Sequence, residues 1–312
     1  MCFSTELWNR RLIIQFELLH SNLLFNLGRG ALFILEEFND DIRCLKLFNW
    51  PNDGLFDVCW SELNEHIVWS CSGDGQIQIW NISSPNLEPV NVIKGHIREI
   101  YSCEWSQVRH DPAAVVTASW DHSVKLWDAN TAVLINEFLA HENIVYSANW
   151  SPLLSCTFAS TSADSTLRIW SSRDCTKPVV EIKASNLEVL TCDWCKYNDN
   201  VIATGSTDGI IHGWDIRSPM MPLFSLMGHS KTIKKVKFSP FKETVLASVS
   251  YDFTTRIWDS HLITQCSSPQ LIVMQNHKEF AYGLDFNLNI PNQLADCGWD
   301  QLVNIFSINH LN

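Results

Sequence analysis

One spacing recurs along most of the chain: an Asp stands six residues before a Trp or a Phe. The pairs are Asp74–Trp80, Asp121–Trp127, Asp164–Trp170, Asp208–Trp214, Asp252–Trp258 and Asp300–Phe306. Their aromatic residues follow one another at intervals of 47, 43, 44, 44 and 48 residues. A period of about 45 residues with this ending is typical of a β-propeller, in which each repeat forms one blade. The spacing therefore predicts a ring of small antiparallel sheets.

The length of the chain fits a single domain of this kind. A chain of 312 residues would ordinarily suggest two domains, but seven repeats of about 45 residues use the same length in one ring. We therefore predict an all-β, seven-bladed β-propeller that spans residues 1–312 as one domain. Residues 51–306 supply six clear repeats, and residues 1–50 supply a degenerate, incomplete first blade.

Two further residue types recur at fixed places in the repeat. A His stands nine residues before the aromatic residue of the inner strand in His96–Trp105, His141–Trp150, His229–Phe238 and His277–Phe286. A Ser stands two residues before the turn Asp in five repeats. A catalytic triad is needed only once in a protein, so a set that recurs in several blades indicates a structural role. We therefore expect no catalytic residues.

This pattern resembles the WD-repeat family, in which His, Ser, Asp and Trp form a hydrogen-bonded network inside each blade. The resemblance implies the same network here, formed by His96, Ser119, Asp121, Trp127, His141, Asp164, Trp170, His229, Ser250, Asp252 and Trp258. Some repeats depart from it: Pro51 and Ser185 stand where His is expected, and the last repeat has Gly298 for Ser and Phe306 for Trp. We expect those blades to be less stable, because a buried Asp without its partner loses about 1–3 kcal/mol.

The first blade is the least regular part of the pattern. Residues 10–16, 30–37 and 42–48 read as its second, third and outer strands, because each is a short run rich in apolar residues. Phe3 and Ser4 read as the end of an inner strand whose beginning is absent. WD-repeat rings usually close with a strand lent by the N-terminus. We expect both the inner strand of the first blade and this closing strand to be missing.

The charge of the chain restricts its partners. Acidic residues exceed basic residues by 34 to 22, which gives a formal net charge of −12. This balance disfavours nucleic acid, which requires a basic surface, and is compatible with a basic peptide. The sequence has no apolar run of the roughly 18 residues that a membrane span needs, so we expect no membrane insertion.

The cysteines do not indicate disulfides or a metal site. The chain has 11 of them without a pairing pattern. Cys59, Cys103 and Cys192 occupy matching places in three repeats and read as small buried residues in a reducing compartment. Cys192 and Cys195 form a Cys-x-x-Cys pair without the second pair of ligands that zinc requires. We expect neither a metal nor another cofactor.

Two positions in each repeat are predicted to lie on the face where the loops entering the inner strands meet the Asp turns. One stands five residues after the His position, and the other immediately precedes the turn Asp. Their aromatic members are Phe56, Tyr101, Trp120, Tyr146, Tyr251, Tyr282 and Trp299. With Glu99 and Glu188 nearby, such a ring suits an amphipathic basic peptide. The alternative is that these aromatic rings only pack the top of the central channel.

Several stretches carry a closer resemblance that includes loops. They are NDGLFDVCWSELNEH (52–66), CSGDGQIQIW (71–80), SWDHSVKLWD (119–128), CDWCKYNDN (192–200), KFSPFKETVLASVSYDFTTRIW (237–258) and ADCGWDQ (295–301). Through these stretches the chain resembles the WD-repeat peroxins that act as import receptors for type-2 peroxisomal targeting signals.

The resemblance implies a non-enzymatic receptor that cycles between the cytoplasm and the peroxisome. Such receptors bind the helical N-terminal signal of a matrix enzyme, with a co-receptor peroxin covering the helix, and deliver the cargo to a peroxisomal docking complex. A basic and an aliphatic residue near the start of the signal would contact the loop face. The cargo-binding residues would then be Phe56, Asp57, Glu99, Tyr101, Trp120, Tyr146, Glu188, Tyr251, Tyr282 and Trp299.

Two other classes of protein stay open at this point. A different WD-repeat interaction protein, such as the substrate receptor of a ubiquitin ligase or a histone-tail reader, would share the fold and ignore a type-2 signal. An enzyme that uses the propeller as a scaffold would need a polar constellation at the central channel, and the sequence shows none.

Overall fold

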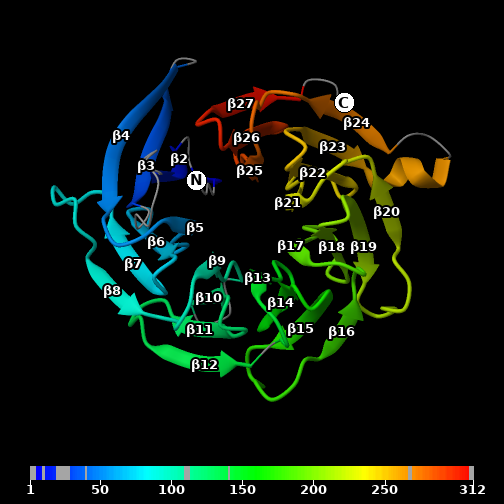
Figure 1. Ribbon diagram of the computed structural model, residues 1–312, viewed down its shortest axis with the longest axis horizontal. Coiled ribbons are helices and arrows are strands. Elements are labelled where there is room, and N and C mark those ends of the chain that lie inside the picture. Colours follow the sequence, from blue (N-terminus) through cyan, green and yellow to red (C-terminus); the bar gives the residue numbers. More distant parts are fainter. Residues whose placement is uncertain are drawn as a thin grey trace, which may run out of the picture.

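The computed structural model describes residues 5–8, 11–18, 29–38, 41–108, 113–139, 141–265 and 269–308. These residues form antiparallel sheets that stand radially around a central axis (Figure 1). Within each sheet, strands that are consecutive in the sequence are neighbours, as short β-runs separated by polar turns require. The all-β propeller class predicted from the sequence is confirmed.

The described strands make seven sheets, each running from an inner strand near the axis to an outer strand at the rim. The first four sheets contain β1 (Thr5–Trp8), β2 (Arg11–Leu18), β3 (Arg29–Phe38), β4 (Asp41–Trp50); β5 (Leu55–Trp60), β6 (Ile67–Ser72), β7 (Gln76–Asn81), β8 (Asn91–Lys94); β9 (Ile100–Trp105), β10 (Ala114–Ser119), β11 (Val124–Asp128), β12 (Leu134–Phe138); and β13 (Val145–Trp150), β14 (Thr157–Ser162), β15 (Thr166–Ser171), β16 (Val180–Lys183).

The other three sheets complete the arc. They contain β17 (Val189–Trp194), β18 (Val201–Ser206), β19 (Ile210–Asp215), β20 (Phe224–Met227); β21 (Ile233–Phe238), β22 (Val245–Ser250), β23 (Thr255–Asp259), β24 (Gln270–Met274); and β25 (Ala281–Phe286), β26 (Gln293–Gly298), β27 (Val303–Ser307). A 3-10 helix, η1 (Ser260–Gln265), stands between β23 and β24. Within the described residues the last sheet has three strands, and the other six sheets have four.

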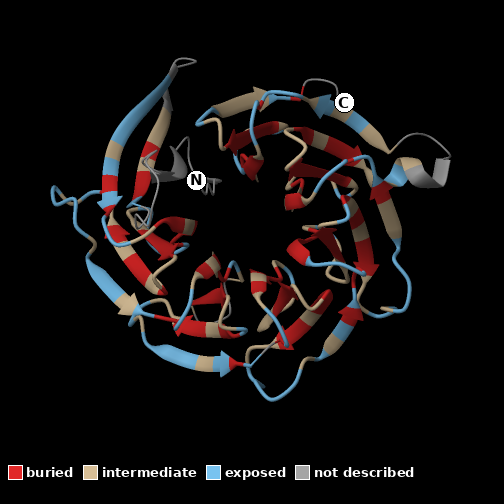
Figure 2. Cartoon of the chain, viewed as in Figure 1, coloured by how far each residue is buried: buried red, intermediate tan, exposed pale blue. Residues whose placement is uncertain are grey.

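The hydrophobic core lies between neighbouring sheets. In the six sheets from β5 to β27 the inner and second strands are mostly buried, whereas the strands at the rim face solvent (Figure 2). In one inter-sheet layer, for example, Leu167 and Ile169 of β15 pack with Trp194 of β17 and Trp214 of β19. The apolar side chains on the face of each sheet are therefore buried against the neighbouring sheet. A single sheet could not bury that face by itself.

The first sheet corrects one prediction and confirms others. The expectation that its inner strand is missing is wrong, because Thr5–Trp8 forms β1, which pairs antiparallel with β2 from Thr5↔Ile14 to Trp8↔Arg11. This short strand contacts both β5 and β25. The sequence reading ended the inner strand at Ser4, one residue before β1 begins. The other three strands of this sheet overlap the predicted segments 10–16, 30–37 and 42–48, of which residue 10 lies outside the described residues.

Candidate peptide-binding site

The loop face is shaped by a β-bulge that recurs at the start of six inner strands. In β5, for instance, Leu55 pairs with Ser72 and Asp57 with Cys71, so Phe56 has no partner in the register. The same shift occurs in β9, β13, β17, β21 and β25. The skipped residues, which we call the bulge ring, are Phe56, Tyr101, Tyr146, Leu190, Lys234 and Tyr282. A bulge turns the side chain of its extra residue away from the regular pleat.

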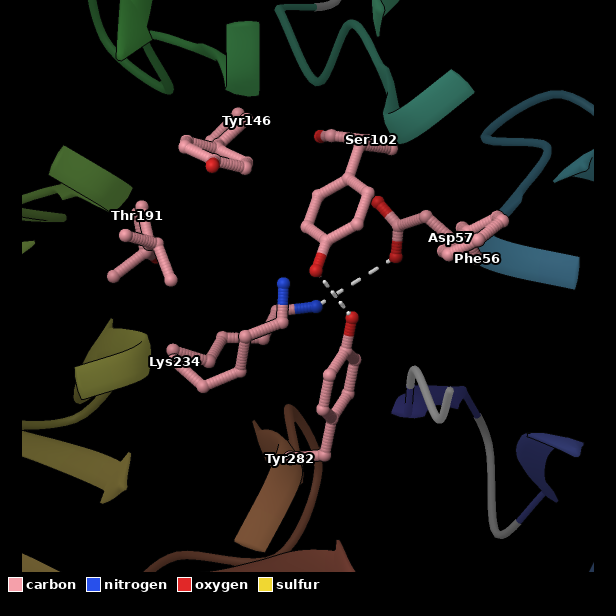
Figure 3. Close-up of a pocket in the computed structure, with 11 residues that line it drawn as sticks. Phe56, Asp57, Ser102, Tyr146, Thr191, Lys234 and Tyr282 are labelled. Carbon is pink, nitrogen blue, oxygen red and sulfur yellow. Dashed lines mark hydrogen bonds and ion pairs between the residues drawn. The ribbon is translucent and has the colours of Figure 1, made fainter. Parts of the chain in front are cut away.

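The bulge ring encloses the mouth of the central channel. All six of its side chains line one cavity of about 40 Å³, and in the close-up those of Phe56, Tyr146, Lys234 and Tyr282 converge from different blades (Figure 3). This volume holds only a small number of water molecules. A peptide would therefore lie across the mouth and would not enter the channel.

Aromatic contacts join the members of the bulge ring. The ring centroid of Tyr101 lies 5.3 Å from that of Phe56 and 5.4 Å from that of Tyr146. Trp120, from the Asp turn of the same blade, lies 5.9 Å from Tyr101. These four rings are partly exposed, so each packs against its neighbour and still offers apolar surface to a ligand.

The most central side chain of the mouth is Lys234, which the sequence analysis did not assign to the site. Lys234 is 8% exposed, and its Nζ lies 3.9 Å from the ring centroid of Tyr101 and 4.4 Å from that of Tyr282. The hydroxyl of Tyr282 donates to that of Tyr101 over 2.9 Å. Lys234 stands at the same repeat position as the five other bulge residues. That position alone would have assigned Lys234 to the mouth from the sequence.

A backbone hydrogen bond fixes each loop to the neighbouring Asp turn. The N–H of Trp120 donates to the carbonyl of Glu99 over 3.0 Å, and that of Thr207 donates to the carbonyl of Glu188 over 3.0 Å. Equivalent bonds hold Tyr251 to Thr232 and Trp299 to Phe280, and two further turns to the loops beside them. The two predicted kinds of loop-face position are therefore locked together by the main chain.

The predicted acidic residues stand at the edge of this mouth. The Glu188 side chain is exposed, and its Oε2 accepts a 2.9 Å hydrogen bond from the Tyr146 hydroxyl. Burial, together with this carboxylate, raises the pKa of Tyr146 above its ordinary value, so the hydroxyl stays a donor. The side chain of Glu99 is 31% exposed, and Nε of Arg98 lies 3.6 Å from its Oε2. Both carboxylates are open to a cationic ligand from the solvent side.

Three predicted aromatic residues form a second group on the same face. Tyr251 and Trp299 are partly exposed, and both contact Phe280, with ring centroids 4.5 Å and 5.0 Å apart. Tyr282, only 3% exposed, lies beneath them with its ring 6.5 Å from that of Tyr251. The structure therefore places the predicted aromatic residues in two groups on either side of Lys234.

Asp57 lines the cavity at the mouth together with Phe56, but its carboxylate is engaged by the neighbouring blade. Its side chain lies in the channel wall, where Oδ2 accepts the backbone N–H of Cys103 over 2.9 Å and Oδ1 lies 3.7 Å from Nζ of Lys235. Through these contacts the carboxylate joins two neighbouring inner strands. Glu104 and Asp193 do the same with the N–H groups of the next inner strands. We therefore leave Asp57 out of the proposed peptide surface.

The hydrogen bonds that link His to Asp are present in the regular blades. Nδ1 of His96, His141 and His229 lies 2.9, 2.8 and 2.9 Å from Oδ2 of Asp121, Asp164 and Asp252, respectively. Burial alone would raise the pKa of these carboxyl groups, but the hydrogen bonds from His and from a neighbouring hydroxyl outweigh it and hold the pKa well below its usual range. Burial conversely lowers the pKa of the three imidazoles.

The hydroxyl that links His to Trp is not the predicted one. Nε2 of His96 lies 2.8 Å from Thr117 Oγ1, which also accepts the Trp127 indole N–H over 2.9 Å. The same link runs through Ser160 to Trp170 and through Ser248 to Trp258. The predicted Ser119 and Ser250 instead accept the N–H of the turn Asp two residues later. The polar residue ten positions before each Trp was the missed signal.

The blades that lack the usual His use other donors. In one, the Ser185 hydroxyl donates to Asp208 over 2.9 Å. In the β5–β8 blade the Gln78 amide bonds to the hydroxyls of Ser70 and Ser72, and Trp80 donates to Ser70 over 2.8 Å. These side chains take the place of the imidazole and keep the buried polar groups satisfied.

The described residues show no metal-binding group of three or more His, Cys, Asp or Glu side chains. Among them, no helix has both the length and the apolar character that crossing a bilayer demands. What the described loop face offers is an aromatic mouth with carboxylates at its edge, which is a surface for binding.

Comparison with known proteins assigns this architecture to a family. The family model described as WD domain, G-beta repeat, matches residues 39–81, 87–128, 132–171, 176–215 and 220–259. The chain is 44% identical over 279 residues to the peroxisomal targeting signal 2 receptor of Mus musculus, which covers 89% of this chain and 85% of the mouse protein. The chain belongs to the WD-repeat family of peroxisomal targeting signal 2 receptors.

Other members of this receptor family are similar to the chain over shorter stretches. The chain is 46% identical to the receptor of Homo sapiens over 133 residues, 43% of this chain and 40% of the human protein. It is 28% identical to the receptor of Saccharomyces cerevisiae over 208 residues, 56% of this chain and 54% of the yeast protein. The family is one of receptors and not of enzymes. Residues beyond 259, which include the last blade, lie outside the segments that the WD-repeat model matches.

Proposed function

We propose that this chain, acting as one domain over residues 1–312 with its seven sheets as blades, binds the helical type-2 signal of peroxisomal matrix proteins across its loop face. The observation that carries the proposal is the bulge ring, because one backbone irregularity repeated in six blades directs Phe56, Tyr101 and Tyr146 into a common mouth. The names of the relatives support the same reading, since each is called a receptor for this signal.

The two sides of an amphipathic signal would meet two kinds of group. The apolar side would pack on Phe56, Tyr101, Trp120 and Tyr146, whose contiguous rings can supply most of the affinity. Basic residues beside it would approach Glu99 and Glu188. Exposed ion pairs contribute about 0.2–1 kcal/mol each, so the carboxylates would orient the helix more than they hold it. A co-receptor would cover the outer side of the helix, and the loaded receptor would dock at the peroxisome from the cytoplasm.

A fluorescence-anisotropy titration with a labelled type-2 signal peptide tests this function. We expect Tyr101→Ala to weaken binding about 30-fold, because truncating a central aromatic contact costs about 2 kcal/mol. We expect Glu99→Lys combined with Glu188→Lys to weaken it about tenfold. The matched control is Glu65→Lys combined with Glu243→Lys, two exposed carboxylates in the loops at the other end of the inner strands.

Equal affinity of all these variants for the signal would exclude the loop face as the site. Binding of any basic helix with the same affinity, irrespective of the signal residues, would favour another WD-repeat interaction protein, such as a histone-tail reader or the substrate receptor of a ubiquitin ligase.

A further inference from the structure

Three cysteines meet in the layer between the β5–β8 sheet and the β9–β12 sheet. Cys59 lies on β5, Cys71 on β6 and Cys103 on β9, and all three are buried in one hydrophobic cluster. The other hydrophobic clusters of the described residues contain one cysteine or none. The three thiols are free. The sequence shows no pairing pattern here because the cysteines belong to two blades and meet only where those blades pack.

The strand register and one hydrogen bond place Cys103 against the cysteine-bearing face of the β5–β8 sheet. Asp57 pairs with Cys71 and Cys59 pairs with Trp69, so these four side chains project from the same face. The carboxylate of Asp57 accepts the N–H of Cys103 over 2.9 Å, which brings β9 onto that face. The thiols of Cys59 and Cys71 both donate hydrogen bonds to the sulfur of Cys103.

The same two positions in another layer show how closely Cys71 and Cys103 approach. Their counterparts in the β17–β20 and β21–β24 sheets are Gly205 and Val236. A Cβ added to Gly205 would lie 3.0 Å from Cγ2 of Val236. This is about the separation between the Cβ of one cysteine and the sulfur of its partner across a disulfide. The repeat therefore gives Cys71 and Cys103 the spacing that a disulfide requires.

Hydrogen bonding makes the thiols of the cluster unequal. Burial alone would raise the pKa of Cys103, but the hydrogen bonds from Cys59 and Cys71 outweigh it and lower that pKa. Burial and the hydrogen bond to Cys103 raise the pKa of Cys71, so the proton stays on Cys71. The thiolate is the form of cysteine that reacts with oxidants. Cys103 is therefore the nucleophile of the cluster.

The central channel gives a small oxidant access to Cys103. Cys103 lines a cavity of about 40 Å³ in the channel, and Asp57, Ser102 and Lys235 line both this cavity and the mouth. A space of this size admits a molecule little larger than water, such as hydrogen peroxide. A bulky oxidant such as a glutathione disulfide is excluded from it.

We propose that Cys71 and Cys103 are a dithiol pair that hydrogen peroxide oxidises to a disulfide, which braces the β5–β8 blade against the β9–β12 blade. The Cys103 thiolate attacks one oxygen of the peroxide, the O–O bond breaks, and a sulfenic acid forms while the released hydroxide takes up a proton. The sulfur of Cys71 then attacks the sulfur of Cys103, and the thiol proton leaves with the displaced hydroxyl as water. Overall, two thiols and one peroxide give one disulfide and two water molecules.

The brace lies directly behind the mouth. Tyr101 stands two residues before Cys103 on β9, and Phe56 stands on β5, which pairs with the strand of Cys71. The disulfide therefore fixes the two blades that carry these contacting rings relative to each other. This inference requires no assumption about the ligand that the mouth binds.

The test is to treat the reduced full chain with hydrogen peroxide, block the remaining thiols and digest the protein with a Glu-specific protease. Cleavage after Glu62 or Glu65 separates Cys59 from Cys71, so mass spectrometry identifies which of them is linked to Cys103. We expect the link to Cys71 as the main product. Oxidation should raise Tm by roughly 5 °C, and dithiothreitol should reverse the rise, since a disulfide restricts the unfolded chain.

Two single substitutions distinguish the partners of Cys103. Cys71→Ala should abolish both the link and the rise in Tm. This variant should fold, because Ala118 occupies the corresponding position of the next blade. Cys59→Ala should retain the link, since Cys59 supplies only a hydrogen bond.

Cys192 is a matched control within the same channel. It occupies the position of Cys103 in the β17–β20 blade and lines the same cavity. Its Sγ lies 3.5 Å from Oδ1 of Asn149, which stands where Cys103 has Cys59. Burial and the neighbouring charge of Asp193 raise the pKa of Cys192. Cys192 should therefore be oxidised at least tenfold more slowly than Cys103.

Three results would overturn the proposal: Cys103 stays reduced while the exposed Cys175 is oxidised, Cys103 links to Cys59 instead, or Cys192 is oxidised as fast as Cys103. An equal rise in Tm for Cys71→Ala would exclude the brace as well. The signal titration is a separate measurement. A protein that forms the link and does not bind the signal peptide retains this inference and loses the proposed function.

Discussion

The β21–β24 blade and the β25–β27 blade are neighbours built from the same repeat, and they differ in three ways. The first has a fourth strand, and the second has three strands among the described residues. Trp258 of the first is fully buried, whereas the corresponding Phe306 is only partly buried. Ser248, which links His229 to Trp258, is replaced in the last blade by Asp296.

These differences are connected. Phe306 has no indole N–H to donate, so position 296 does not need a hydroxyl to accept a hydrogen bond from the third strand. Asp296 instead accepts from the Asn304 amide over 2.9 Å and from the Thr255 hydroxyl of the preceding blade over 2.6 Å. Its Oδ1 also lies 3.1 Å from Nε2 of His277, whose Nδ1 faces Asp300 at 3.0 Å. In the regular blade the imidazole lies between a carboxylate and a hydroxyl, whereas in the last blade it lies between two carboxylates.

The comparison teaches that the blades draw on different sources of stability. In the first blade the fourth strand, β24, covers β23, so every residue of β23 that faces the core is buried. In the last blade no residue of β27 is fully buried. The last blade is correspondingly more dependent on charge and on its neighbour. Two substitution pairs and one pH profile can test this contrast.

The largest effect is expected at the aromatic residue of the third strand. Trp258→Ala should lower the free energy of unfolding by about 3–5 kcal/mol, because it empties a closed site in the core. Phe306→Ala should cost about 1–2 kcal/mol, since its ring is already partly exposed. Chemical denaturation followed by far-UV circular dichroism, a signal that does not depend on the replaced tryptophan, gives both values. Equal losses would show that β27 is as well covered as β23.

The turn Asp should give a smaller effect. Asp252→Ala removes the partner of His229 and of the Thr254 hydroxyl, and should destabilise the protein by about 1–3 kcal/mol. Asp300→Ala should cost less, because His277 keeps Asp296. Thermal denaturation compares the two variants, and Thr254→Val controls for loss of the hydroxyl alone. An Asp252→Ala protein as stable as its parent would contradict a structural role for the turn Asp.

The smallest effect is a difference in pH dependence. Burial lowers the pKa of His229, so its contribution to stability is present above the ordinary value of 6.5 and is lost as the pH falls below it. For His277, burial is outweighed by Asp296 and Asp300, which raise the pKa. Its contribution is present below the ordinary pKa and is lost as the pH rises through the raised one.

We therefore expect the parent protein to lose about 1 kcal/mol relative to Asp296→Ser as the pH rises from 6 to 8. Unfolding free energies measured across this interval test the sign. A parallel pH profile of the parent and the Asp296→Ser variant would show that Asp296 does not hold the proton on His277.

The repeat spacing was enough to predict the architecture, because strand, turn and aromatic residue are all local to one repeat. The loop-face positions followed from the same count, and the structure brings Phe56, Tyr101 and Tyr146 together. Their role in cargo binding stays a prediction. The bulges were not predictable, since register depends on how two strands pair and not on the composition of either one.

Two details of the mouth could not be read from the repeat. Lys234 was left out because only the aromatic members of its repeat position were selected, yet two tyrosine rings from other blades surround its ammonium group. Asp57 lines the same cavity as Phe56, yet its carboxylate accepts an amide N–H of the next blade, so its role in cargo binding stays a prediction. Both depend on contacts between blades, which a repeat pattern does not contain.

The carboxylates that join neighbouring inner strands have a consequence for the kinetics of recognition. Asp57, Glu104 and Asp193 each belong to one blade and hold an N–H of the next, so single blades cannot tilt independently at the axis. A ligand that arrives at the mouth meets a template that is already in its final shape. Its association rate should then depend on electrostatic steering by the acidic protein, and sequence differences between signals should be expressed mainly in how long each complex lasts.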